Sequence, residues 1–280
     1  MDRFTPTDLR PLFPREREKL LELLRSLSPE EWQLPTVAAG WSVHDMVSHL
    51  LNGDLRFIAA RRDGYQSPAG PSVQPPYGRA EVTALVNQIN EAWVAGAYFL
   101  SPRQLIEQLE RSGVEYSATM ESFDMNALGM PVDWVAPGPA PVWIDVAREY
   151  TERWIHQAQL RDATGRPPLD DRWALYPVFD TFMLALPNAL RTVDAPEGAN
   201  VYLTVRGEAG CTWIVRKRAE GWEFGSDRGV EPFAALAIDQ DDAWRLYTKG
   251  ITPAEVLPRV EQRGDADALA ALIGMVTVLA

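Results

Sequence analysis

Two side chains with the chemistry to bind a cation lie four residues apart, in the segment from 149 to 165. They are Glu152 and His156, and the chain contains only three histidines. In a helix, residues four apart lie on one face, so a carboxylate and an imidazole here could hold one divalent cation together. The same spacing is also typical of an exposed helical pair without any ligand. A third ligand from elsewhere in the chain would decide between the two interpretations.

The second histidine of interest, His49, lies in a predicted helix over residues 41–62. It stands among apolar positions that should face the interior of a helical bundle. A histidine on such a face is often a core residue with a satisfied hydrogen bond. If this helix faces Glu152 and His156, however, His49 becomes the third ligand. His44 lies five residues earlier, roughly 140° around the helix, and we expect it at the solvent-facing surface.

Two neutral imidazoles and one carboxylate around a divalent cation would leave a net charge of about +1. Three protein ligands leave positions open for water or a thiolate, as in catalytic zinc sites. Zinc suits this nitrogen and oxygen set best, and nickel or iron would also fit. Such a cation lowers the pKa of bound water and deprotonates a bound thiol. Asp45 and Asn52 could orient His49 from outside the site.

Composition restricts the partners of the protein. The 280 residues suggest two domains, and the net charge of −12 disfavours nucleic acid and anionic membranes. No apolar run reaches the roughly 18 residues of a membrane span, and the polar, charged residues at the start of the sequence lead us to expect no signal peptide. A single cysteine excludes an intramolecular disulfide and fits a cytoplasmic protein. We therefore expect a small-molecule substrate, with monomer and homodimer both open.

Apolar periodicity predicts that residues 1–168 form a four-helix bundle with long connections. Ser42 and Asp45 form a capping-box pair at the start of the helix that carries His49. Loops rich in proline and glycine are expected at 65–79, as a rim over a site, and at 128–141. The predicted helices cover residues 15–27, 41–62, 81–100, 101–110 or beyond, and 142–165.

Residues 169–280 predict a smaller α+β domain with an antiparallel sheet, so the fold class is α+β. Turn signals at 207–210 and 218–221 are typical of hairpins. The predicted strands are 201–207, 211–217, 221–226 and 233–238. The predicted helices are 172–191, broken at its prolines, then 239–248, 253–263 and 265–279.

Three short segments resemble a known family. They are Gly40-Trp41-Ser42-Val43, Val47-Ser48-His49-Leu50 and Glu152-Arg153-Trp154-Ile155-His156. Together they resemble the DinB-like metal-binding bundle, and more closely the mycothiol-dependent maleylpyruvate isomerase family. The resemblance implies that His49, Glu152 and His156 are the metal ligands. Segments of the second half, among them Val201–Gly207 and Asp242–Leu246, resemble the sterol-carrier-protein-like C-terminal domain of that family.

The resemblance implies an enzyme, an isomerase or S-transferase that uses a low-molecular-weight thiol such as mycothiol. Arg245 and Lys249 are the candidates for binding an acidic substrate in catalysis. The chain departs from many relatives at Gln159, where they carry an acidic residue. The residues themselves leave two alternatives open. One is a metal-dependent hydrolase with Glu149 as base, and the other is a non-catalytic small-ligand binding protein lined by tryptophans such as Trp134, Trp143 and Trp154.

Overall fold

The computed structural model describes residues 7–65, 79–136, 138–226, 229–275 and 277, and divides into two compact units. A helical unit contains Leu9–Asp124 and Glu152–Leu169, and a sheet unit contains mainly Met125–Thr151 and Asp170–Ala280. The predicted domain ranges 1–168 and 169–280 differ from these units chiefly in the segment 125–151, and they stay a prediction. The expected rim loop at 65–79 lies almost wholly outside the described residues.

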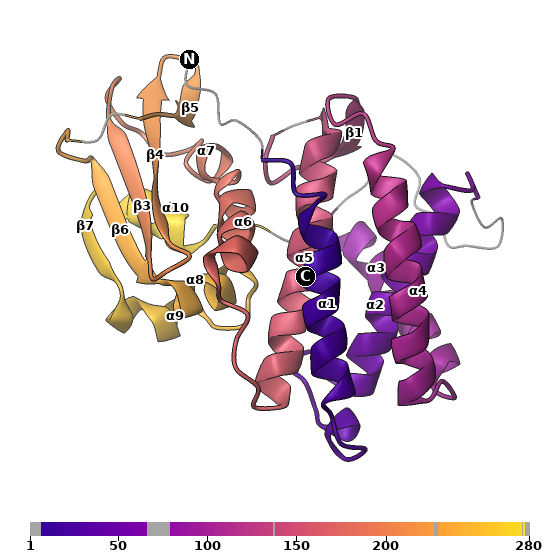
Figure 1. Ribbon diagram of the computed structural model, residues 1–280. Coiled ribbons are helices and arrows are strands. Elements are labelled where there is room, and N and C mark those ends of the chain that lie inside the picture. The colour runs from indigo at the N-terminus through magenta and orange to yellow at the C-terminus, as the bar shows by residue number, and fades with distance from the viewer. Residues whose placement is uncertain (1–6, 66–78, 137, 227–228, 276, 278–280) are drawn as a thin grey trace. The chain divides into compact units, whose positions relative to one another are not determined.

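The helical unit confirms the predicted helical N-terminal region. The described residues contain five long helices, one for each helical range expected from the sequence, so the expected count of four main helices is one too few. The helix α4 packs against α1 and α2, and α2 also contacts α3. The last helix, α5, belongs to this unit from Glu152 onward. The bounds are α1 Leu12–Arg25, α2 Val43–Arg61, α3 Arg79–Ala97, α4 Pro102–Glu121 and α5 Val142–Ala163 (Figure 1).

A leucine-rich core holds these helices together. Its side chains recur at helical spacing on the inner faces of α1, α2 and α4, and each is almost fully buried. Burying one such side chain contributes about 1.5–3 kcal/mol. The core therefore fixes the faces of α2 that turn inward and outward. Its members include Leu20, Leu24, Val43, Met46, Leu50, Leu105 and Leu109.

The predicted capping box at the start of α2 is confirmed. The Ser42 hydroxyl accepts a hydrogen bond from the Asp45 backbone N–H at 3.2 Å, and the Asp45 carboxylate accepts one from the Ser42 N–H at 2.9 Å. These bonds satisfy two N–H groups that a helix N-terminus leaves free. The helix therefore begins at a defined residue, and His49 lies at a fixed angle around it.

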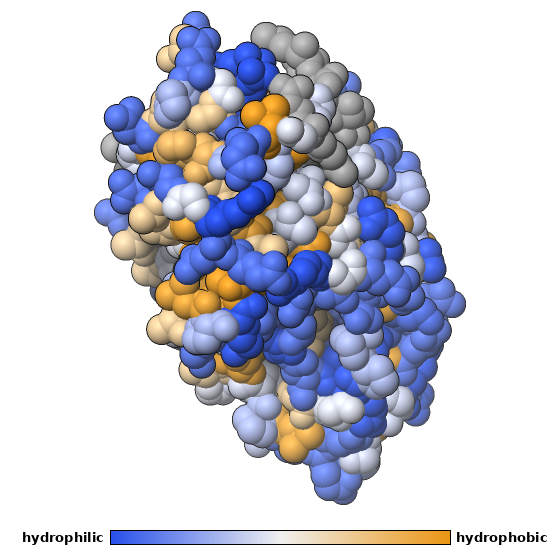
Figure 2. Space-filling model, turned by 90° about the vertical axis from the view of Figure 1, so that its left-hand side faces the viewer, coloured by the Kyte–Doolittle hydropathy of each residue, from blue (hydrophilic) through white to orange (hydrophobic). Residues whose placement is uncertain are grey.

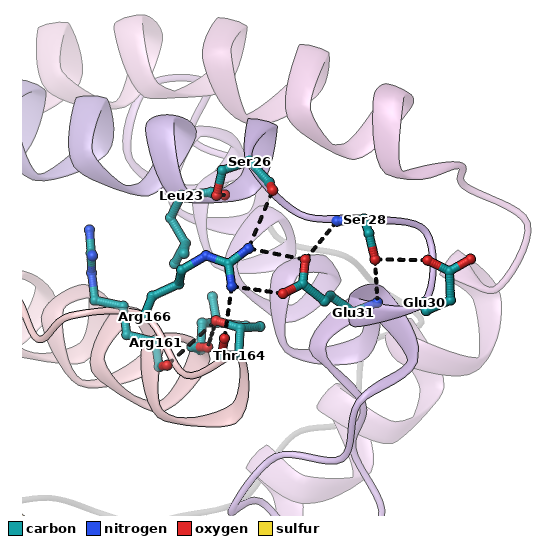
Figure 3. A network of polar contacts seen from close by, with 9 residues as sticks. Leu23, Ser26, Ser28, Glu30, Glu31, Arg161, Thr164 and Arg166 are labelled. Carbon is teal, nitrogen blue, oxygen red and sulfur yellow. Dashed lines mark hydrogen bonds and ion pairs between the residues drawn. The ribbon is translucent and has the colours of Figure 1, made fainter.

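A polar network ties the end of α5 to the segment between α1 and α2 (Figure 3). Arg166, just after α5, binds both carboxylate oxygens of Glu31 at 2.7 and 3.0 Å. Glu31 opens the short helix η1 (Glu31–Gln33), and its carboxylate also accepts the Ser28 backbone N–H at 2.7 Å. Paired bonds of this kind fix orientation as well as distance. They hold the end of α5 close to the chain that enters α2.

The sheet unit contains a five-stranded sheet in the order β5-β4-β3-β6-β7. The two hairpin pairings β3–β4 and β4–β5 are antiparallel, as predicted, but β3 and β6 are parallel. The α+β fold class is confirmed, and β6 and β7 are antiparallel as well. The sheet is mixed at the single β3–β6 pairing, because the chain returns from β5 to the far side of β3 and runs alongside it. The bounds are β3 Asn200–Arg206, β4 Cys211–Arg218, β5 Gly221–Phe224, β6 Ala234–Asp239 and β7 Glu261–Gly264.

Alternate residues of β3 and β6 are buried, which shows that one face of the sheet forms the core of this unit. The helices α8 and α10 contact β6. The predicted helix over 253–263 is wrong in its second half, which continues as η2 and then as the exposed edge strand β7. The helices are α6 Arg172–Met183, α7 Leu186–Ala189, α8 Gln240–Tyr247, α9 Pro253–Val256, η2 Leu257–Arg259 and α10 Ala266–Ile273.

The prediction of a loop over 128–141 is also incomplete, because this segment contains a two-stranded ribbon of β1 (Leu128–Pro131) and β2 (Pro139–Pro141).

The face of the molecule in Figure 2 is mostly hydrophilic, with small scattered hydrophobic groups. Isolated apolar residues of this kind are normal for a protein surface. Within the ranges that the structure describes, no helix is both long and apolar enough to cross a membrane.

Candidate metal centre

The helices α2 and α5 bring His49, Glu152 and His156 together. The Nε2 atom of His156 lies 3.0 Å from Glu152 Oε1, and the Nε2 atom of His49 lies 3.5 Å from the same oxygen. One ligand atom from each residue lies within 4.8 Å of the others. Tetrahedral ligands about 2.0–2.2 Å from a zinc ion are about 3.4 Å apart. The spacing of the three side chains therefore fits a divalent cation.

The orientation of the two rings also fits a shared cation. Their centroids are 4.9 Å apart and their planes are nearly perpendicular, at 80°. The histidine side chains are mostly buried, with 14% and 15% of their surface exposed, whereas the Glu152 side chain is 49% exposed. The site is therefore closed on the histidine side and open to solvent on the carboxylate side. Three protein ligands would also leave a coordination position for water or substrate, as in catalytic zinc sites.

The two histidines differ in their outer hydrogen bonds. The His156 Nδ1–H donates to Gln159 Oε1 at 2.8 Å, which leaves Nε2 as the atom that can bind a cation. The Nδ1 atom of His49 is buried and has no hydrogen-bond partner among the described residues. The predicted role of Asp45 or Asn52 in orienting His49 is therefore not observed. The Asp45 carboxylate instead accepts the Ser42 N–H in the cap of α2.

The charges of the site favour an ion pair between Glu152 and His156. Burial acts to raise the pKa of Glu152. The positive charges of His156 and His49, and the hydrogen bonds that these histidines donate, outweigh burial and hold that pKa well below its usual range. Desolvation acts to lower the pKa of His156, but the Glu152 carboxylate and the bond to Gln159 raise it overall. Glu152 is thus ionised at neutral pH, as a metal ligand must be.

An aromatic side chain forms one wall beside the ligands. The Trp41 ring centroid lies 5.1 Å from that of His49, with the planes tilted by 50°. Trp41 is half-buried and directly precedes the Ser42 cap. Its position therefore follows from the same capping box that starts α2. It restricts the motion of a histidine ring whose second nitrogen lacks a hydrogen bond.

A buried ionic network joins the two ligand-bearing helices, α2 and α5, to α1 and α4. Asp54, on α2, accepts two bonds from Arg17 at 2.7 and 3.0 Å, one from Arg153 at 3.0 Å and one from Ser112 at 2.6 Å. The side chains of Asp54, Arg17 and Arg153 are 0%, 9% and 5% exposed. Arg153 directly follows Glu152, so its bond to Asp54 fixes the rotation of α5 against α2.

A second buried contact continues this network towards α1. The Gln157 amide, next to His156 in the chain, donates to the Glu16 carboxylate at 2.6 Å. The other oxygen of Glu16 is buried without a partner among the described residues. Burial raises the pKa of Glu16, although the neighbouring charge of Arg17 opposes this. Neither part of the network was predicted from the sequence, although Arg17 and Asp54 occupy apolar stripes of α1 and α2.

His44 lies away from the metal centre, but the prediction that it is solvent-facing is wrong. The residue is buried, and its Nε2–H donates to the Leu100 carbonyl at 2.7 Å. Its ring also packs against Trp32, with centroids 6.4 Å apart. The chain between α3 and α4 covers the first turn of α2, which sequence periodicity alone does not reveal.

The two predicted substrate-binding residues, Arg245 and Lys249, belong to the sheet unit. Arg245 pairs with Asp241 at 3.2 Å, and its guanidinium carbon lies 4.3 Å from the Trp244 ring centroid. Lys249 is exposed just after α8 and has a positive φ of 63°. Their role towards the metal centre stays a prediction.

Comparison with known proteins decides the family. The family model described as the mycothiol maleylpyruvate isomerase N-terminal domain matches residues 13–161, more than half of the chain. The protein belongs to this family. The matched range includes all three residues of the candidate metal centre. The resemblance in the motifs around His49 and Glu152 is therefore confirmed.

Solved structures agree in fold. Crystal structures of the mycothiol-dependent maleylpyruvate isomerase, one of them a mutant, match with a TM-score of 0.52 over 88% of this chain and 91% of theirs. Sequence identity is 12%, so the likeness concerns the fold alone. A sterol carrier protein 2-like protein from Aedes aegypti matches 35% of this chain and 95% of its own at 20% identity. Its TM-score of 0.27 is too low to support a fold assignment. No curated protein matches the sequence.

Proposed function

We propose that the protein is a metal-dependent enzyme that uses a low-molecular-weight thiol, as an isomerase or an S-transferase. The observation that carries the proposal is the convergence of His49, Glu152 and His156 with ligand spacing in a member of this family. Zinc is the cation that best suits two imidazoles and a carboxylate. Mycothiol is the proposed thiol, because the related family is named for it.

The ligand set gives the site its chemistry. When bound, a divalent cation holds a thiol as thiolate, a nucleophile that can add to an activated double bond and leave again. Glu152 contributes one negative charge and the two imidazoles none, so one positive charge remains to attract an anion. The half-exposed side of Glu152 gives a ligand access from solvent. Trp41 excludes water on the side of His49.

The substrate in this proposal is a small electrophile that carries a carboxylate. Arg245 and Lys249 are proposed to bind that carboxylate through charge-assisted hydrogen bonds. An arginine would bind it by two parallel bonds, whereas a lysine would act as a point charge. Replacing each residue by methionine, which retains the length of the side chain, would raise the KM for an acidic substrate.

The test is turnover of a broad panel of electrophiles with the full chain, with and without thiol and with and without chelator. The proposal predicts turnover that needs both the thiol and the metal. Absence of metal-dependent turnover and of thiol binding across the panel would overturn it. Metal-dependent hydrolysis without thiol would favour the hydrolase alternative, and ligand binding without turnover would favour a non-catalytic binding protein.

A further inference from the structure

Among the residues that the structure describes, Gln159 is the side chain that hydrogen-bonds to a candidate metal-ligand histidine from outside the centre. Its amide oxygen accepts the His156 Nδ1–H at 2.8 Å. Because an amide oxygen can only accept, the ring carries a proton on Nδ1, and Nε2, which lies 3.0 Å from Glu152 Oε1, is the nitrogen that would bind a cation in place of its proton. Gln159 lies on α5, three residues after His156, and is half-buried. Its position is therefore set by the same helix that carries two ligands.

The charge around the ligands is low. Among the described residues, the hydrogen bonds and ion pairs of His49, Glu152 and His156 include one carboxylate, that of Glu152 itself. Arg153 lies beside Glu152 in the chain and donates to Asp54 at 3.0 Å, a carboxylate that it shares with Arg17. A carboxylate in place of the Gln159 amide would add a second negative charge next to His156. The amide instead fixes the ring without changing the charge.

We propose that Gln159 sets the net charge of the metal centre and so determines its preference for anionic ligands. This inference rests on the proposed function and specifies the ligand class. A histidine whose outer N–H is hydrogen-bonded to a neutral amide is a less basic metal ligand than one whose outer N–H is hydrogen-bonded to a carboxylate. The site therefore holds its cation less tightly but keeps one positive charge for a thiolate or another small anion. Gln159 is a positioning residue, since it acts through His156.

The experiment compares cobalt(II) binding to the wild type, Q159E and Q159M, followed by visible absorption of the bound ion. Q159E keeps an acceptor and adds a charge, whereas Q159M removes the acceptor at similar size. The control is Q108E, which adds the same charge at an exposed position on α4. We expect affinity about tenfold higher in Q159E and about tenfold lower in Q159M. Q108E should match the wild type.

A second titration separates charge from geometry. Thiocyanate, an anion, and imidazole, a neutral ligand, are added to the cobalt-loaded proteins. Q159E should bind thiocyanate about tenfold more weakly and imidazole with unchanged affinity. Because Q159E retains the hydrogen bond, this comparison remains valid if Q159M fails to fold.

The outcomes distinguish this inference from the function on which it rests. If the wild type binds cobalt, and Q159E has the same affinities for cobalt and for thiocyanate as the wild type, the proposed role of Gln159 is wrong but the metal centre is supported. If Q159E weakens thiocyanate and imidazole equally, the effect is steric and the inference is also wrong. If the wild type binds no cobalt, the proposed function and this inference both fail.

Discussion

Removing Asp54 should destabilise the helical unit far more than removing a surface aspartate. In the wild type its carboxylate accepts four hydrogen bonds from Arg17, Arg153 and Ser112, and it is fully buried. The substitution D54A would leave two buried guanidinium groups without their shared anion. Breaking a buried pair by removing one partner costs about 3–5 kcal/mol.

The matched control is D63A. Asp63 also pairs with an arginine, Arg62, at 2.8 Å, but both side chains are about half exposed. Exposed pairs contribute about 0–1 kcal/mol. The two variants should therefore differ by about 2–5 kcal/mol in the free energy of unfolding. That difference is a large part of the 5–15 kcal/mol typical of a folded domain.

The assay is urea unfolding of both variants, followed by far-UV circular dichroism at several pH values. Burial acts to raise the pKa of Asp54, but Arg17 and Arg153 outweigh it and lower that pKa. Its contribution is therefore present above the unfolded pKa of about 3.9 and is lost as the pH falls through the lower folded value. Equal losses of stability in D54A and D63A at neutral pH would refute the reasoning.

Three further predictions concern single side chains. Burial raises the pKa of Glu16, so ionising this carboxyl in the folded protein costs stability, and E16Q avoids that cost. The free energy of unfolding of E16Q, measured in urea, should therefore rise relative to that of the wild type as the pH increases from about 4 to 8. A difference that stays constant with pH would contradict this. S42A removes the cap of α2 and should cost about 1 kcal/mol in thermal unfolding, as should S101A at the equivalent cap of α4. G264A should lower the melting temperature, since φ is +96° and a Cβ would lie 2.2 Å from the Phe233 carbonyl; an unchanged melting temperature would show that β7 adapts.

Two of the three ligand residues were accessible from sequence because their geometry is local, whereas the third, His49, lies far away in the chain and was joined to them through the family resemblance. Glu152 and His156 share a helix face at four-residue spacing, and His49 interrupts an apolar stripe. The structure brings these three residues together at the distances given above. The outer bond from His156 to Gln159 is local too, at three-residue spacing. Its role was not anticipated, because a glutamine on a helix is usually solvated.

The buried network could not be predicted as a set, because its members lie far apart in the chain. Asp54 is 37 residues from Arg17 and 99 from Arg153. Each charged side chain alone is typical of a solvated helix face. A signal was nevertheless present, since Arg17 follows Phe13 by four residues and precedes Leu21 by four. A charge inside an apolar stripe indicates a buried partner.

The sheet shows a different limit of sequence patterns. Hairpin partners are neighbours in the chain, so β3, β4 and β5 followed from turn signals and alternation. The parallel pairing of β3 with β6 depends on a longer connection that carries no such signal. The edge strand β7 consists of Glu261, Gln262, Arg263 and Gly264, all exposed. Polar edge strands protect a sheet from further pairing and have no apolar period to detect.

The metal content of the protein tests the central claim most directly. The wild type, H49A and H44A would be purified without chelator and analysed for bound metal by elemental analysis. His44 is the matched control, because it lies on the same helix but hydrogen-bonds to Leu100 outside the centre. We predict about one divalent ion per chain in the wild type and in H44A, and little in H49A. Equal metal in the wild type and H49A, or none in the wild type, would contradict the assignment of His49, Glu152 and His156 as a metal centre.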